Sequence, residues 1–146
     1  MALHSVTVAS APDVVYAVVA DGNARPAWLP ELERTEGAPQ RPLDEGDRFT
    51  GYSSLLAHRF AGSSEVTGAQ PASRLAERVI IGACLTTEWR FESIDGGRAT
   101  KVSQSMDVEY PQGPLGRVAR WVLGRRIERL QHESLRRLAA LVEARS

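Results

Sequence analysis

The sequence is poor in the residues that form disulfides and metal sites. Its 146 residues include one cysteine, Cys84, and three histidines, His4, His58 and His132. One cysteine cannot form an internal disulfide, which fits a reducing compartment, and we expect a cytoplasmic protein. No Cys or His pair has metal-ligand spacing, and there is no glycine-rich phosphate loop or Gly-x-Ser-x-Gly motif. We therefore expect neither a metal site nor a cofactor.

The sequence also lacks a net charge and any long hydrophobic run. It holds 18 basic and 18 acidic residues, so no overall field favours a nucleic-acid partner, and we expect none. No segment approaches the roughly 20 apolar residues of a membrane-spanning helix. The N-terminus has no basic segment ahead of its apolar residues. We expect neither stable membrane insertion nor a signal peptide.

The apolar and charged content of the chain is typical of one globular domain. Apolar residues make up 42% of the chain and charged residues 25%, which is ordinary for a globular protein. A chain of this length can bury a substantial core. No linker, repeat or low-complexity tract divides it. We expect a single domain over residues 1–146, as a monomer or homodimer.

The longest element is predicted at residues 113–144. Pro114 suits the first turn of a helix, where its missing N–H would be unpaired anyway. Helical spacing relates the apolar residues Leu115, Ala119, Val122, Leu123, Ile127, Leu130, Leu138, Leu141 and Val142. Roughly 30 residues at 1.5 Å each span about 45 Å. This helix therefore crosses a whole small domain.

The rest of the chain is predicted to form strands and two short helices. Residues 3–9 alternate like a strand, and two short helices follow between residues 10 and 32, the second broken by Pro26 and Pro30. Further strands are expected at 33–38, 47–55, 59–68, 74–81, 84–94 and 99–110. Short turns between consecutive strands indicate an antiparallel sheet. The predicted fold class is therefore α+β: a curved antiparallel sheet of about seven strands around one long C-terminal helix, with a cavity between them.

Strand parity predicts which side chains face that cavity. In the segment 84–94, Leu85 and Trp89 belong to the apolar parity; in 99–110, Met106 and Val108 do. Gln104 shares the parity of Met106 and Val108. Two interpretations of Gln104 stay open: hydrogen bonds within the sheet or to water, or contact with a ligand.

Several short motifs carry a resemblance to a known family. They are residues 11–16 (APDVVY) with Asp21, 28–32 (WLPEL), Leu43 with Gly46, Pro71 with Arg74 and Leu75, 89–91 (WRF), 96–100 (GGRAT) and the helix 113–144. In their order and spacing the chain resembles the START/Bet v 1-like (SRPBCC) superfamily, in particular its bacterial polyketide cyclase/dehydrase and lipid-transport group. The resemblance implies a helix-grip fold with an internal cavity. It leaves function open, because the superfamily includes carriers, cyclases and receptors.

Two strands have an ambiguous orientation. In 74–81, hydrophobicity favours an inward Glu77 together with its apolar neighbours, whereas the resemblance favours an inward Arg78. The same resemblance implies that Ser63 and Glu65 point inward, although family cyclases have an arginine at the position of Glu65. Glu65 and Arg78 then form either a buried pair or a solvated pair on the outer face.

The function expected from these patterns is binding of a hydrophobic small molecule, such as a lipid, polyketide or aromatic metabolite. The predicted ligand-binding residues are Trp28, Phe49, Ser63, Leu85, Trp89, Gln104, Met106, Val108, Leu115, Ala119, Val122 and Arg126. A carrier or sequestering protein is one interpretation. The alternative is a cofactor-independent polyketide cyclase/dehydratase with Glu65 and Arg78 as catalytic residues. A third is an interaction protein whose cavity is filled.

The first half of the long helix is rich in arginine. It contains Arg117, Arg120, Arg125 and Arg129, with a single acidic residue, Glu128. A basic helix face can contact acidic lipid or nucleic acid. Zero net charge and the lack of interleaved aromatic residues favour a solvated face instead. Trp121 points away from the apolar stripe, which suits a contact with a loop or a second subunit.

Overall fold

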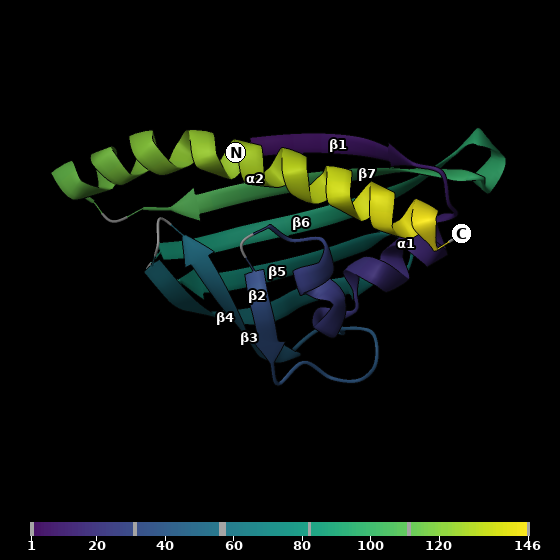
Figure 1. Cartoon of the computed structure of the whole chain (residues 1–146), viewed down its shortest axis with the longest axis horizontal. Helices are drawn as coiled ribbons and strands as arrows, with labels where there is room; N and C mark the ends of the chain where they lie inside the picture. Colours follow the sequence, from purple (N-terminus) through teal and green to yellow (C-terminus); the bar gives the residue numbers. More distant parts are fainter. Residues whose placement is uncertain (1, 31, 56–57, 82, 111, 146) are drawn as a thin grey trace.

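The structure is a curved antiparallel sheet with one long helix across its concave face (Figure 1). It is a computed structural model, and it describes residues 2–30, 32–55, 58–81, 83–110 and 112–145. The strands are β1 (Ala2–Val8), β2 (Leu32–Glu36), β3 (Arg48–Leu55), β4 (His58–Gln70), β5 (Arg74–Ile81), β6 (Ala83–Ile94) and β7 (Ala99–Glu109). Their order in the sheet is β1-β7-β6-β5-β4-β3-β2. The predicted α+β helix-grip fold is confirmed.

The long helix α2 (Pro114–Ala144) begins and ends where the sequence predicts. Gly113 precedes it with φ 102°, a conformation that other residues adopt only at a cost. The second half of α2 buries Leu135, Leu138 and Val142 against the sheet and α1. The first turns extend beyond the end of the sheet (Figure 1). No helix in the described part of the chain is long and apolar enough to cross a membrane.

Two short helices connect β1 to β2. The helix α1 (Pro12–Val19) has proline in its first turn and buries Val15 and Val19. The second, η1 (Gly22–Ala27), is a 3₁₀ helix that contains Pro26. Its proline, and the short length usual for 3₁₀ helices, explain why this segment is short and broken, as predicted. Both helices lie under the second half of α2 (Figure 1).

Candidate functional site

A cavity of about 270 Å³ lies inside the curve of the sheet. Its wall consists of residues from η1 and the segment after it and from strands β2 to β7, and Leu130 closes it from α2. Five residues predicted from the sequence line it: Phe49, Leu85, Trp89, Gln104 and Met106. Leu85, Trp89, Gln104 and Met106 lie where strand parity predicts, because β6 and β7 alternate between a buried and a solvated face.

Other predicted lining residues lie elsewhere. Trp28 is fully buried behind the wall, edge-on to Trp89 with ring centroids 6.2 Å apart. Val108 and Ala119 are partly buried and lie outside the cavity wall, and Leu115 is exposed. None of these four residues lines the cavity, so the expectation for them is wrong. For Leu115 and Ala119 the reason is that α2 crosses the cavity at Leu130, about four turns beyond Leu115.

The two remaining predictions on α2 concern Val122 and Arg126. The side chain of Val122 lies outside the described part of the chain. Arg126 is partly buried and is not one of the residues that line the cavity. The expectation that Arg126 meets a ligand at the cavity wall is therefore wrong. The reason is again the place at which α2 crosses the cavity.

Ser63, Glu65 and Arg78 are on the outer face of the sheet. Glu65 is half exposed and forms an ion pair of 3.3 Å with Arg48, its cross-strand partner on β3. Arg78 is the cross-strand partner of Glu65 on β5 and is exposed. The inward orientation implied by the resemblance is therefore wrong, and the argument for acid–base catalysis by Glu65 and Arg78 falls with it. Because side chains alternate, the same register turns Ser64, Glu77 and Val79 inward.

Glu77 forms a buried ion pair that sequence reasoning did not find. Arg25 of η1 donates to both carboxylate oxygens of Glu77, at 2.6 Å and 3.4 Å, and its Nε donates to the carbonyl of Val19 at 2.8 Å. The side chains of Arg25 and Glu77 are 4% and 1% exposed. The bidentate geometry offsets part of the large desolvation cost of the two charges. The pair ties η1 to the middle of the sheet and borders the inner end of the cavity.

Aromatic rings surround the guanidinium group of Arg25. Its central carbon lies 4.8 Å from the ring centroid of Trp89, 5.6 Å from that of Trp28 and 5.9 Å from that of Phe49. Cations within about 6 Å of an aromatic face are attracted by the ring quadrupole. The guanidinium group therefore has favourable contacts with two rings of the cavity wall, Trp89 and Phe49, and with Trp28 behind it.

A hydrogen-bond donor and an acceptor are left over at the same inner end. Trp89 and Gln104 are directly opposite each other on β6 and β7, and each is 2% exposed. The amide Nε2 of Gln104 donates to Thr87 Oγ1 at 3.2 Å. The other amide atom, Oε1, and the indole Nε1 of Trp89 have no hydrogen-bond partner among the described residues. Leaving such atoms unpaired costs about 1 to 3 kcal/mol each.

The cavity runs from a buried inner end to the surface. Glu77, Trp89 and Gln104 are almost fully buried, whereas Ile81 and Met106 on the same strands are partly exposed. Phe60 also lines the cavity and is 39% exposed. The cavity mouth is therefore at the end of the sheet where β5 ends and β6 begins. In the described ranges, no group of three or more His, Cys, Asp or Glu residues could hold a metal ion.

Comparison with known proteins identifies the family of this chain. Residues 3–143 match the family model described as polyketide cyclase / dehydrase and lipid transport. No curated protein sequence is significantly similar to the chain.

Solved structures share the whole fold. The Zhui aromatase/cyclase from Streptomyces sp. R1128 is 22% identical, with a TM-score of 0.83 over 99% of this chain and 93% of that one. TTHA0849 from Thermus thermophilus is 17% identical, with a TM-score of 0.76 over 99% and 97%. A START superfamily protein from Mycobacterium smegmatis is 18% identical, with a TM-score of 0.63 over 99% and 94%. At these identities the likeness shows the fold alone. Because the family model spans nearly the whole chain, the protein belongs to the polyketide cyclase/dehydrase and lipid transport family.

Proposed function

We propose that this protein binds a hydrophobic molecule of about two rings that carries a hydroxyl group, and that it acts as a carrier or sequestering protein. The observation that carries the proposal is the apolar cavity with an unpartnered donor and acceptor at its inner end. A cavity of about 150 Å³ holds benzene, so about 270 Å³ suits a molecule nearly twice that size.

The hydroxyl group follows from the chemistry of Trp89 and Gln104. An indole N–H only donates, and an amide oxygen only accepts. A hydroxyl both accepts and donates, so one hydroxyl within hydrogen-bond reach of both atoms would satisfy both. A hydroxyl also suits the site if the side-chain amide of Gln104 is flipped, because the amide nitrogen then donates a hydrogen bond to the hydroxyl oxygen. A pure hydrocarbon leaves both buried atoms unpaired, and the site therefore favours the hydroxylated molecule.

A carrier is favoured over an enzyme because the ionisable groups at the cavity are paired with each other. Among the described residues that line the cavity, Arg25 and Glu77 are the ionisable ones. Each is bound to the other through two hydrogen bonds. A general acid or base must reach the substrate proton directly or through one water. Glu77 would first have to leave Arg25, which exposes an unpaired charge to an apolar wall.

A polyketide cyclase/dehydratase is the second candidate, and one observation favours it. The carboxylate of Glu77 borders the cavity and is almost fully buried, and buried carboxylates can serve proton transfer. In this mechanism the cavity folds the chain and Glu77 moves protons between carbons. Substituting Glu77→Gln should then abolish turnover of a polyketide-like substrate while sparing its binding. Equal turnover by the variant and the parent protein would exclude this mechanism.

Titration with a matched pair of probes tests the binding proposal. We expect 2-naphthol to bind about tenfold or more tightly than naphthalene, because naphthalene leaves polar atoms unpaired. Gln104→Leu should weaken 2-naphthol binding and leave naphthalene binding unchanged or improved. Gln70→Leu, at an exposed glutamine of β4, is the control and should change neither affinity. Equal affinities for the two probes in the parent protein and in Gln104→Leu would refute the role of the hydroxyl, and absence of binding by either probe would refute the cavity.

A further inference from the structure

The first half of α2 presents apolar side chains to solvent. Leu115 is 83% exposed, Val118 59% and Trp121 76%. Residues three and six positions apart lie on one side of a helix. These three side chains therefore form a continuous apolar stripe, on the part of α2 that extends beyond the sheet (Figure 1). Burying such side chains is favourable, and the described part of the chain leaves them uncovered.

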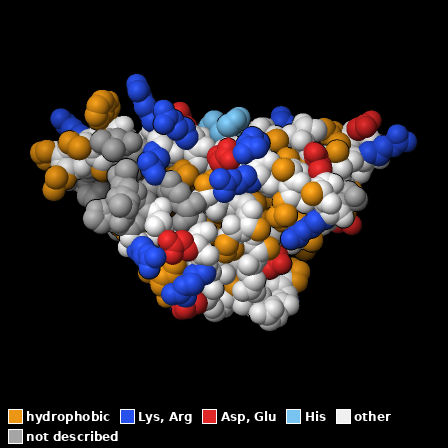
Figure 2. All heavy atoms as spheres, viewed as in Figure 1, with side chains coloured by type: hydrophobic (Ala, Val, Ile, Leu, Met, Phe, Trp, Pro, Cys, Tyr) orange, Lys and Arg blue, Asp and Glu red, His pale blue; other side chains and the backbone are white. Residues whose placement is uncertain are grey.

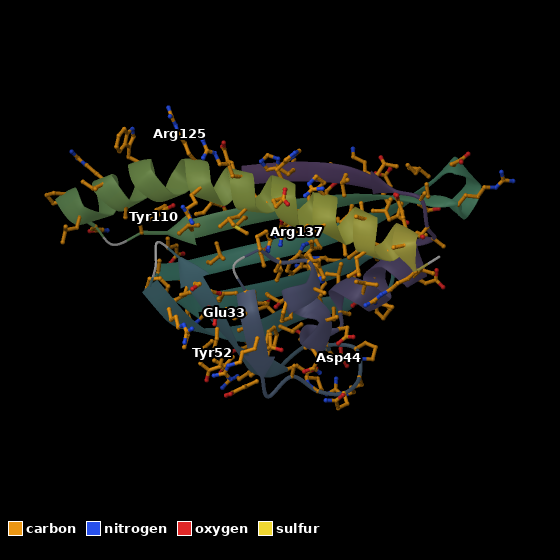
Figure 3. All side chains as sticks on the ribbon, in the orientation of Figure 1. Glu33, Asp44, Tyr52, Tyr110, Arg125 and Arg137 are labelled. Atoms are coloured by element: carbon orange, nitrogen blue, oxygen red, sulfur yellow. The ribbon has the colours of Figure 1, made fainter. Side chains whose placement is uncertain are left out.

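Arginines flank this stripe. At about 100° per residue, Arg125 and Arg129 fall on the same side of the helix as the stripe, and Arg117 lies at its edge, about 40° from Trp121. All three are exposed and have no ion pair with a described residue. Figure 2 shows hydrophobic side chains beside basic ones where α2 begins, and Figure 3 shows Arg125 projecting away from the sheet. We call Leu115, Arg117, Val118, Trp121, Arg125 and Arg129 the α2 face.

The charge of this segment departs from that of the whole chain. Residues 114–130 contain five arginines and one glutamate, so their formal charge is 5 − 1 = +4, whereas the chain as a whole carries +0. The positive charge is therefore concentrated on the half of α2 that also bears the apolar stripe.

We propose that the α2 face docks on the surface of an anionic lipid bilayer. An interfacial helix needs apolar side chains to enter the boundary between head groups and acyl chains, and basic side chains to meet lipid phosphates. Tryptophan favours that boundary because its ring is apolar and its N–H is polar. The α2 face supplies all three kinds of side chain within five turns of helix.

Other occupants fit the same face less well. In a symmetric dimer the same patch meets itself, so a second copy would bring the arginines of one α2 face close to those of the other. Nucleic acid would engage the arginines but would leave Leu115 and Val118 without an apolar partner. An anionic bilayer satisfies both the charges and the apolar stripe.

The α2 face lies at the same end of the sheet as the cavity mouth. Glu109, at the end of β7, pairs with Cys84 at the start of β6, and α2 begins five residues after Glu109. The cavity mouth, bordered by Ile81 and Leu85, is at this same end of the sheet. A protein docked through the α2 face therefore holds the cavity mouth close to the membrane, where apolar molecules partition. This docking goes beyond the proposed cavity ligand and does not depend on it.

Vesicle binding tests the proposal. We expect the protein to co-sediment with vesicles of equal parts phosphatidylcholine and phosphatidylglycerol, and to bind phosphatidylcholine alone at least tenfold more weakly. Trp28 and Trp89 are buried, so a blue shift of tryptophan emission on binding reports Trp121. Trp121→Ser should weaken vesicle binding and remove the shift. No binding to the mixed vesicles, or binding without the emission shift, would overturn the proposal.

A matched pair of charge variants separates the α2 face from charge in general. Each arginine near an anionic surface is worth about fivefold in affinity. The double variant Arg117→Glu/Arg125→Glu should therefore bind at least about 25-fold more weakly at low salt. Arg98→Glu/Arg145→Glu has the same net charge but alters exposed arginines away from the face, and should bind like the parent protein. Equal losses in both variants would overturn the proposal. The α2-face variant should still bind 2-naphthol normally, which keeps this test independent of the cavity.

Discussion

The buried ion pair between Arg25 and Glu77 makes a quantitative prediction about stability. Replacing Arg25 by Met keeps an unbranched apolar stem but removes the charge and three hydrogen bonds, two to Glu77 and one to Val19. The carboxylate of Glu77 then remains in an apolar site without its cation. Breaking a buried pair in this way costs about 3 to 5 kcal/mol. For a domain near this size the melting temperature should fall by about 6 to 20 °C.

Urea unfolding, followed by far-UV circular dichroism, measures this cost. Arg25→Met and Glu77→Leu should each lower the free energy of unfolding, whereas the double variant should lose much less than the sum, because it leaves no unpaired charge. The exposed pair of Arg48 and Glu65 is the control, since Arg48→Met should cost at most about 1 kcal/mol. Losses below about 1 kcal/mol for both Arg25→Met and Glu77→Leu, or strictly additive losses, would refute the reasoning.

Two further predictions concern α2. Leu138→Ala should lower the free energy of unfolding by about 2 to 5 kcal/mol in urea titrations, because Leu138 is fully buried. The same substitution at the exposed Leu115 should change it by less than about 0.5 kcal/mol. Equal costs at the two positions would contradict the different burial of the first and second halves of α2. Hydrogen bonds from Arg136 and Arg137 lower the pKa of Glu133 from 4.5 to about 2. Their stabilising effect is therefore complete above about pH 4.5 and is lost as the pH falls towards 2. Carboxyl titration by NMR should show this low pKa, and Arg136→Ala with Arg137→Ala should return it towards 4.5; an unchanged pKa would disprove the role of the two arginines.

The elements of this fold could be predicted because each leaves a periodic pattern in the sequence. The apolar residues of 113–144 recur at helical spacing, and Asp95-Gly96-Gly97 separates two strands that alternate. On β6 and β7 the apolar parity is unambiguous, so Trp89 and Gln104 could be assigned to the inner face. The ambiguity arose on β4 and β5, where polar residues occupy both parities. There hydrophobicity was the better guide than the resemblance.

Features that depend on distant contacts left no such pattern. Hydrophobicity placed Glu77 on the inner face, but its partner Arg25 lies in a short 3₁₀ helix that has no periodicity to orient it. The apolar stripe of α2 did not show that Leu115 lies beyond the sheet, because spacing says which side of a helix is apolar and not what covers it.

The indole N–H resonance of Trp89 tests the central claim most directly. In a ¹H–¹⁵N spectrum the three indole signals can be assigned with Trp→Phe variants. On addition of 2-naphthol we expect the Trp89 signal to move downfield as its unpartnered N–H donates to the hydroxyl, while the exposed Trp121 signal stays in place. Naphthalene should produce a smaller shift of Trp89. A 2-naphthol titration that leaves the Trp89 signal unchanged, or moves the Trp121 signal instead, would contradict ligand binding at the inner end of the cavity.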